Sequence, residues 1–153
     1  MSILSKNIKL LRSYEKNIKG ALASYVEVGI IGDKVQGNLY NGTPIVEIAA
    51  QHEFGSNEHN VPQRSFIRHS VNVKSNELKS FINKKLDVKK SLKREKRLEL
   101  IGIFATNIIK KSFTTKGYGS WQPLKDETIK GKGSSQILIE NGNLRRAVTW
   151  NVA

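Results

Sequence analysis

The chain has 153 residues, with 26 Lys and Arg against 13 Asp and Glu, a formal net charge of +13, and no cysteine. This length suits one hydrophobic core and is short for two ordinary domains, so we expect a single domain over residues 1–153. The lack of cysteine excludes disulfides and thiolate metal sites. Because no apolar run reaches the ~20 residues of a membrane span, we expect a soluble protein made in the cytosol, without a membrane partner.

The first part of the chain predicts a helix and then a strand. Residues 4–19 place four apolar side chains on one helical face: Leu4, Ile8, Leu11 and Ile18. Residues 24–31 alternate in a way typical of a strand, with Val26, Val28 and Ile30 on one side. The polar residues 33–42 include two glycines and predict a hairpin or a loop.

The next helix has clear start and stop signals. Thr43 suits the capping position and Pro44 the first helical position, so we expect a helix from Pro44 to Phe54. Gly55 then supplies the left-handed conformation that ends a helix.

A polar turn connects this helix to an expected strand. Residues 56–60 are turn formers or charged, and Pro62 keeps Val61 out of helical torsions. Residues 65–71 predict a short strand, on which Arg64, Phe66 and Arg68 would project to the same face. Burying two unpaired cations is costly, so that face should lie at a sheet rim or the arginines should pair with acids, of which Glu53 and Glu58 are nearest in sequence.

Two helices follow, with a basic run between them. Residues 76–86 and about 91–113 carry apolar side chains at helical spacing, and the second is the best core helix of the sequence. Between Lys84 and Arg97, eight of fourteen residues are Lys or Arg. This run is either a helical linker or the exposed start of the long helix, and its lack of an apolar stripe predicts that it makes no obligatory core contact.

The last part of the chain predicts a long loop and a hairpin. Residues 114–135 contain four glycines and few aliphatic residues, which predicts a flexible, functional loop, with a helical turn at residues 126–130 and Trp121 and Leu124 as anchors. Residues 136–139 and 144–152, around a turn at Asn141-Gly142, predict a hairpin. The elements together indicate an α+β fold, in which a small antiparallel or mixed sheet packs against several helices, one of them long and running from basic to apolar.

Two sequence blocks resemble a known family. The first is His52-Glu53-Phe54-Gly55, a polar loop, and then Pro62-x-Arg64-x-Phe66-Ile67-Arg68; the second is Trp121-x-Pro123-Leu124, Thr128, Lys132, Leu138 and Gly142-x-Leu144. Together they resemble the virion morphogenesis and tail-completion proteins of tailed bacteriophages, which include small neck and tail-terminator subunits. The resemblance spans most of the chain from about Val26 onward.

The resemblance implies a structural virion protein made in the host cytoplasm. Such a subunit forms a homo-oligomeric ring, commonly of six copies, at the junction between head and tail, where it binds the tail tube and head-connector proteins and DNA passes through it. The interface residues it suggests are Glu53, Phe54, Gly55, Pro62, Arg64, Phe66, Arg68 and Trp121. For Phe54, Gly55, Phe66 and Trp121, a role in building the fold is the preferred interpretation.

The sequence contains no recognisable catalytic, cofactor or metal motif. His52-Glu53 lacks the second histidine that a zinc helix needs four residues on, since position 56 is Ser. Neither a Gly-x-Ser-x-Gly elbow nor a complete P-loop is present. We therefore expect a protein that is not an enzyme and that needs no cofactor.

The charge distribution supports a second hypothesis. Residues 71–153 hold eighteen of the basic residues and seven of the acidic ones, a net charge of +11. Such a field attracts polyanions, although a solvated basic face is the alternative. The rival prediction is a nucleic-acid-binding accessory protein that contacts phosphates non-specifically through Lys89, Lys90, Lys93 and Arg94.

Overall fold

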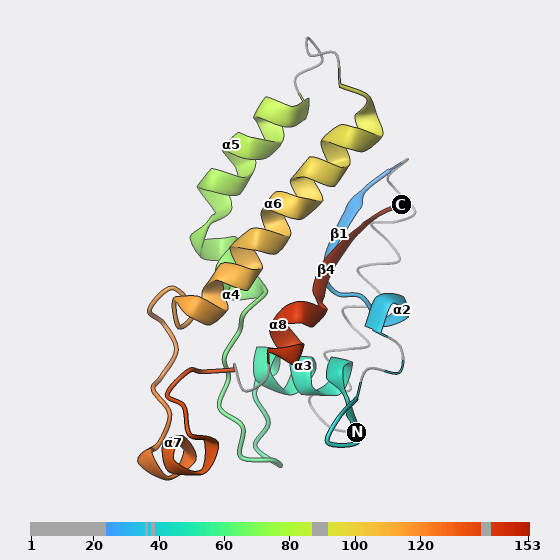
Figure 1. The fold of residues 1–153 in the computed structure, drawn as a ribbon. Coiled ribbons are helices and arrows are strands. Elements are labelled where there is room, and N and C mark those ends of the chain that lie inside the picture. Colours follow the sequence, from blue (N-terminus) through green and yellow to red (C-terminus); the bar gives the residue numbers. More distant parts are fainter. Residues whose placement is uncertain (1–23, 36, 38, 87–91, 139–141) are drawn as a thin grey trace.

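The computed structural model describes residues 24–35, 37, 39–86, 92–138 and 142–153. The helix expected at residues 4–19 lies outside this part of the chain, as do Lys89 and Lys90. The fold is α+β, as expected: two small antiparallel sheets pack against several helices (Figure 1). Each sheet has two strands.

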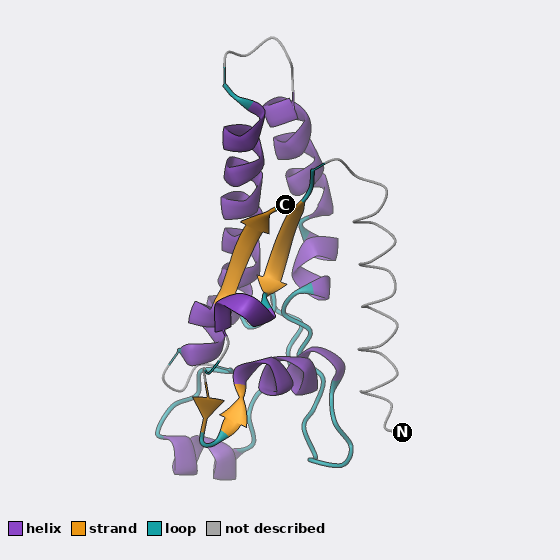
Figure 2. Ribbon diagram, turned by 90° about the vertical axis from the view of Figure 1, so that its right-hand side faces the viewer, coloured by secondary structure: helices purple, strands orange, loops and turns teal. Residues whose placement is uncertain are grey.

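The main sheet joins the two ends of the described chain. Strand β1 (Val26–Ile30) pairs antiparallel with β4 (Val148–Val152), so that Val28 lies opposite Trp150. The long helix α6 (Arg94–Thr114) runs behind this ribbon (Figure 2). The Trp150 ring packs directly against Gly102, where a Cβ atom would lie 2.9 Å from the ring. The strand predicted at residues 24–31 is confirmed. Its alternating apolar residues allow it to pack against α6.

The expected C-terminal hairpin is wrong. Residues Asn143–Ala147 form a short helix, α8, and the strand that follows pairs with β1 at the other end of the chain. Leu144 and Ala147 are three residues apart, so one helical turn buries both of them. Gly142 has a φ of 76° and turns the chain into this helix.

A small hairpin leads into the second helix. A single helical turn, α2 (Gly32–Val35), precedes β2 (Leu39–Tyr40) and β3 (Thr43–Pro44), which pair with each other. Helix α3 (Ile45–Phe54) follows, within the bounds that the sequence predicts. The predicted capping by Thr43 is wrong, because Thr43 pairs with Tyr40 in the hairpin and no side chain caps the first turn of α3.

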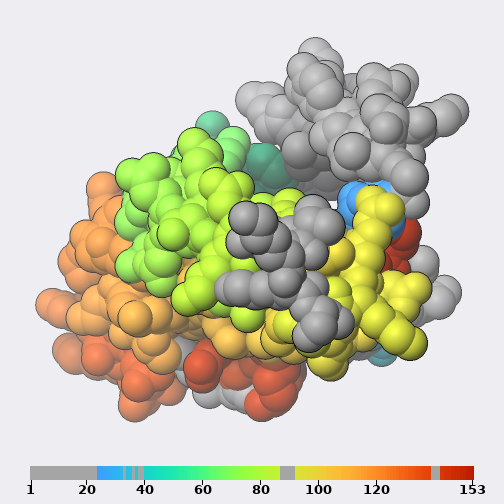
Figure 3. Space-filling model, turned by 90° about the horizontal axis from the view of Figure 1, so that it is seen from above, coloured from blue at the N-terminus to red at the C-terminus, as the bar shows by residue number. Residues whose placement is uncertain are grey.

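Helices α5 and α6 form an arm that extends past the end of the main sheet. The short helix α4 (Arg68–Val73) leads into α5 (Ser75–Leu86), which packs along α6 and confirms the helix predicted there. Phe81 and Phe104 stack across the pair, with ring centroids 4.0 Å apart and planes at 6°. No residue of α5 is buried. Seen from the free end of the arm, α5 and the beginning of α6 reach the surface (Figure 3).

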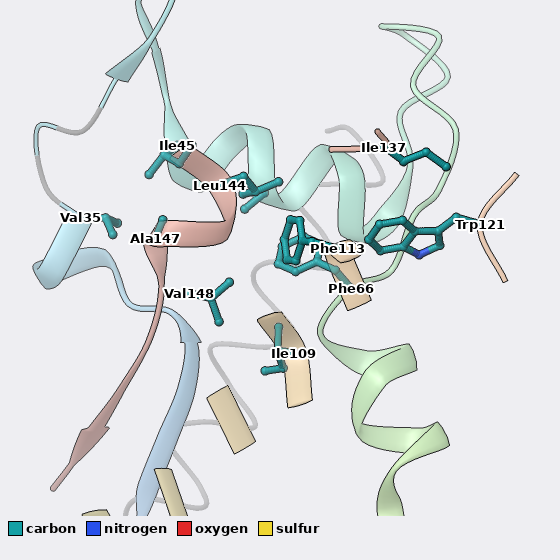
Figure 4. Close-up of a cluster of buried hydrophobic side chains, with 11 residues drawn as sticks. Val35, Ile45, Phe66, Ile109, Phe113, Trp121, Ile137, Leu144, Ala147 and Val148 are labelled. Atoms are coloured by element: carbon teal, nitrogen blue, oxygen red, sulfur yellow. The ribbon is translucent and has the colours of Figure 1, made fainter. Parts of the chain in front are cut away.

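The core lies where α3, α8 and the C-terminal half of α6 meet. Figure 4 shows Ile45, Leu144 and Val148 on one side of it and the aromatic rings of Phe66, Phe113 and Trp121 on the other. The Phe66 and Phe113 centroids are 5.2 Å apart, and Phe113 meets Trp121 edge-on at 6.0 Å. The interpretation of Trp121 as a packing anchor is confirmed.

Trp121 divides the predicted long loop into two parts. Residues 115–120 form a tight turn at the end of α6, and Asp126–Lys132 form α7, which ends at Gly133 in the left-handed conformation. The helical turn expected at residues 126–130 is therefore confirmed. No residue of α7 is buried.

Candidate functional site

The turn between α3 and α4 is organised by one buried carboxylate. Glu53, in the last turn of α3, accepts a hydrogen bond from Ser65 Oγ at 2.6 Å. It also accepts three from backbone N–H groups, those of Phe66 and Ile67 at 2.9 Å and that of Arg68 at 3.0 Å. The first N–H groups of a helix have no partner within that helix. Glu53 therefore caps α4 from a different helix, with charge-assisted hydrogen bonds.

This capping explains why the strand predicted at residues 65–71 is wrong. The carboxylate gathers consecutive N–H groups on one side, as a helix start requires, whereas a strand would point alternate N–H groups in opposite directions. Phe66 then turns fully into the core, with 0 % of its surface exposed. Consequently Arg64 and Arg68 do not share a face with it.

The two arginines occupy different environments. Arg68 is exposed, with its Nε 3.9 Å from Glu53 Oε1 and its guanidinium 5.5 Å from the centroid of the Phe54 ring. The expectation that an arginine pairs with Glu53 is thus confirmed for Arg68. Arg64 is buried, with 8 % of its surface exposed.

The polar turn itself is closed by backbone bonds. Ser56 and Val61 exchange two hydrogen bonds, at 2.9 and 2.8 Å. Gly55 ends α3 with a φ of 76°, which confirms the expected stop signal. Pro62 lies exposed beyond this turn.

A cavity of about 220 Å³ opens beside the buried arginine. It lies among helices α3, α7 and α8 and the segments that lead into α7 and α8. Its apolar wall consists of Ile45, Ile48, Leu124, Leu138 and Leu144, and its polar wall of Tyr40, His52, Arg64, Thr128, Lys132 and Asn143. No acidic side chain of the described residues lines it.

The charged side chains of the described residues that line this cavity are all basic. Arg64 Nε and His52 Nδ1 are buried without a hydrogen-bond partner among the described residues. Burial lowers the pKa of Arg64 from its ordinary value. Burial first, and then the charges of Arg64 and Lys132, lower the pKa of His52 to about 4. At neutral pH, therefore, His52 is uncharged, and no acid among the described residues that line the cavity balances the positive charge of Arg64.

The two blocks that carry the family resemblance meet at this cavity. The first supplies His52 and Arg64, and the second supplies Leu124, Thr128, Lys132, Leu138, Gly142 and Leu144. The sequence predicts His52 only as part of the packing stripe of α3, and it does not predict the cavity. Both blocks carry the same sequence signal for the cavity: a basic residue, Arg64 or Lys132, lies close in sequence to residues that build the core.

The structure separates the other predicted interface residues into two groups. Glu53, Phe66 and Trp121 are buried and belong to the fold. Pro62 and Arg68 are exposed, and Phe54 is half-buried beneath Arg68. Of the predicted phosphate contacts, Lys93 and Arg94 are exposed at the start of α6.

Comparisons with known proteins return no relative. No family model matches the chain, and no curated protein or solved structure matches it. Within the described residues, no group of three or more His, Asp or Glu side chains is placed to hold a metal ion. No helix among these residues is long and apolar enough to cross a membrane.

Proposed function

We propose that this protein is a structural subunit of a tailed-bacteriophage virion that acts in tail completion or head–tail joining. In this role its copies close into a ring that contacts the tail tube and the head connector, and DNA passes through the ring. The resemblance of the two sequence blocks supports this proposal. Head-to-tail contacts between identical subunits are what closes such a ring.

The observation that carries the proposal is the incomplete burial of the α5–α6 arm. Four large apolar side chains on the arm and at its base have exposed fractions of 41–50 %: Val73, Leu86, Leu92 and Ile103. Helix α5 has no buried residue and packs on α6 by one side only. Apolar side chains gathered on one exposed substructure are typical of a surface that another protein covers.

The charge of the arm agrees with a position next to DNA. Lys84, Lys93 and Arg94 are exposed near its free end, where α5 finishes and α6 begins. A ring whose arms point inward would present these cations to the DNA phosphates. The contacts would be independent of sequence, because phosphates carry no base information.

The test is the mass of the purified protein, alone and mixed with tail tubes. We expect an assembly of about six times the 17.2 kDa of one chain, seen by native mass spectrometry and as rings by electron microscopy. Replacing Val73 and Ile103 together with Ser should reduce assembly. Val46→Ser is the matched control, because Val46 is equally exposed but lies on α3. A monomer that neither assembles nor binds tail tubes at micromolar concentration would refute the proposal.

The exposed cations of the arm also favour a second candidate function. A monomer that contacts duplex phosphates through Lys93, Arg94 and their neighbours would be a nucleic-acid-binding accessory protein. The same mass measurement separates the two functions, since only the first requires a ring.

A further inference from the structure

The Nε atom of Arg64 is buried and has no hydrogen-bond partner among the described residues. Its backbone N–H donates to the His52 carbonyl at 2.7 Å, which fixes the start of the side chain. The side chain then enters the cavity, where Nε has no hydrogen-bond partner in the described part of the chain. Burying a charged group while one of its donors is unpaired is costly. Such an arrangement is expected where a ligand supplies the missing charge.

The chemistry of the walls restricts what that ligand can be. A guanidinium presents a planar fork of donors that matches a carboxylate in two parallel hydrogen bonds. The same cavity is lined by Ile45, Ile48 and Leu144, which offer an apolar surface, so the group beside the carboxylate should be apolar. The cavity, at about 220 Å³, is smaller than the roughly 300–1,000 Å³ of pockets for drug-sized ligands. It suits one or two amino-acid residues.

Duplex DNA does not fit this description. Only 8 % of the Arg64 surface is exposed, so the phosphates of a rigid double helix cannot reach the guanidinium. The cations suited to DNA are the exposed ones of the α5–α6 arm. The helices that contribute to the cavity lining, α3, α7 and α8, also lie at the opposite end of the molecule from the free end of that arm (Figure 1).

We propose that the cavity at Arg64 is a docking site for a carboxylate with a neighbouring apolar side chain, presented by a partner polypeptide. Arg64 binds the carboxylate, and the apolar wall holds the adjacent side chain. The carboxylate comes either from a chain terminus or from an internal Glu or Asp. The inference goes beyond ring formation, because it concerns a pocket that each single subunit possesses.

The experiment is an NMR titration of the full-length protein labelled with nitrogen-15, followed through the Arg64 Nε–H signal. N-acetyl-leucine represents a chain terminus, and the peptide amide N-acetyl-Leu-Glu-NH₂ represents an internal acid. N-acetyl-leucinamide and N-acetyl-Leu-Gln-NH₂ are their uncharged counterparts. We expect at least one acid to shift the signal in a saturable way, with at least tenfold tighter binding than its uncharged counterpart. The stronger of the two acids identifies the source of the carboxylate.

Two outcomes would overturn the proposal. The first is that neither acid shifts the signal beyond its uncharged counterpart. The second is that inorganic phosphate binds as tightly as the acids, which would make the cavity an unselective anion site. Because the measurement uses the isolated protein, it can fail while ring formation stands, and the reverse is also true.

Variants provide an independent measurement. Arg64→Gln should abolish the effect of the acids on the backbone signals of His52 and Leu144, whereas Arg68→Gln should leave it unchanged because Arg68 is exposed and lies outside the cavity lining. If Arg64→Gln does not fold, the titration of the unsubstituted protein still decides the question.

Discussion

Glu53 is the residue on which the geometry of the α3–α4 turn depends. Its two oxygens accept four hydrogen bonds, three of them from backbone N–H groups. In Glu53→Gln an amide nitrogen replaces one oxygen and faces at least one backbone N–H, so two donors oppose each other. Hydrogen bonds to charged groups contribute about 1.5–3 kcal/mol, and a buried unsatisfied donor costs about 1–3 kcal/mol.

We therefore expect Glu53→Gln to lower the free energy of unfolding by about 3 kcal/mol, measured by urea denaturation. The matched control is Glu58→Gln, in the exposed part of the same turn, which should change the stability by less than about 0.5 kcal/mol. Equal effects of the two substitutions would show that the capping of α4 is not what stabilises this turn.

Gly117 is required for a steric reason that can be separated from its backbone conformation. It has a φ of 65°, and a Cβ atom there would lie 2.3 Å from the Trp121 ring. Gly119 has a φ of 85°, but a Cβ atom there would have no neighbour within 4 Å. Both Ala variants carry the cost of about 1–2 kcal/mol for a side chain in the left-handed region. Only Gly117→Ala adds an overpacking cost of about 1–3 kcal/mol.

The melting temperature should accordingly fall further for Gly117→Ala than for Gly119→Ala. Trp121 fluorescence, with Trp150→Phe as the background to remove the second tryptophan, should shift only in the first variant. A larger loss for Gly119→Ala would contradict the close packing of Trp121 on the turn.

His52 predicts a specific dependence of stability on pH. Its pKa is about 4 in the folded protein and about 6.5 when unfolded, so between these values the unfolded chain binds a proton that the folded one does not. Stability is then greatest above pH 6.5 and falls as the pH drops toward 4. The expected loss is about 3 kcal/mol, because each pKa unit corresponds to about 1.4 kcal/mol.

The measurement is the free energy of unfolding at pH 7 and pH 4 for the unsubstituted protein and for His52→Gln. The change in the free energy of unfolding between the two pH values should be smaller in His52→Gln by about 3 kcal/mol. His59→Gln, at an exposed histidine, is the control and should leave the difference unchanged. If His52→Gln also leaves it unchanged, His52 is not the group responsible.

The elements that could be predicted from sequence are those whose signals are local. Strand β1, helix α3 and the two helices of the arm carry periodicity or stop signals within their own residues, and they lie where these signals place them. The strand predicted at residues 65–71 is wrong because the group that caps α4 at Arg68, the Glu53 carboxylate, comes from another helix. Likewise, the pattern of Leu144–Ala147 fits a strand no better than it fits a helical turn. The strand that follows these residues pairs with β1, far away in the chain.

The candidate site could be predicted only in part for the same reason. Arg64 stood out because a cation next to Phe66 is unusual, and it was assigned to an interface between subunits. His52, Thr128 and Lys132 gave no chemical signal of their own, since their meaning depends on which segments the fold brings together. Spacing along the chain cannot show that α3, α7 and α8 share a cavity.

Helix α7 is the described element least supported by the core. None of its residues is buried, and Gly131 and Gly133 lie at its end, whereas the preceding turn is held by Trp121 and by Tyr118, whose hydroxyl donates to the Ile108 carbonyl at 2.7 Å. Local opening requires few contacts to be broken in such a segment. Limited trypsin digestion should therefore cut at Lys125, Lys130 or Lys132 before it cuts at Lys116.

The sites can be identified by mass spectrometry of the early fragments. Among the described residues, first cleavage at Lys116 would contradict the division of the predicted loop into a packed turn and a loosely held helix. A carboxylate probe bound in the cavity should slow cleavage at Lys132, which lines it, and leave cleavage at Lys125 unchanged.

For the molecule as a whole, the separation of its features supports the proposed ring subunit over the nucleic-acid-binding accessory protein. Apolar side chains and exposed cations occur together on the α5–α6 arm, while the cavity and the Glu53 turn lie with α3 at the other end of the molecule (Figure 1). A ring subunit needs a surface for its neighbours and tolerates cations that face DNA. A phosphate-binding accessory protein needs the cations alone.

The salt dependence of DNA binding measures how many cations of the basic segment Lys84–Arg97 contact phosphates. Each phosphate contact contributes about −0.9 to the slope of log K against log salt for duplex DNA. Replacing Lys89, Lys90, Lys93 and Arg94 with Ser should then make the slope less steep by roughly 3 to 4 if all four contact phosphates, and leave it nearly unchanged if they are only a solvated face. The control variant replaces four exposed cations that lie outside the arm, Lys116, Lys125, Lys130 and Arg145, and so changes the net charge equally. A similar change of slope in both variants would mean that DNA responds to total charge and that the arm is not a specific phosphate site. Because each variant should also keep a melting temperature close to that of the unsubstituted protein, loss of folding can be excluded as the cause.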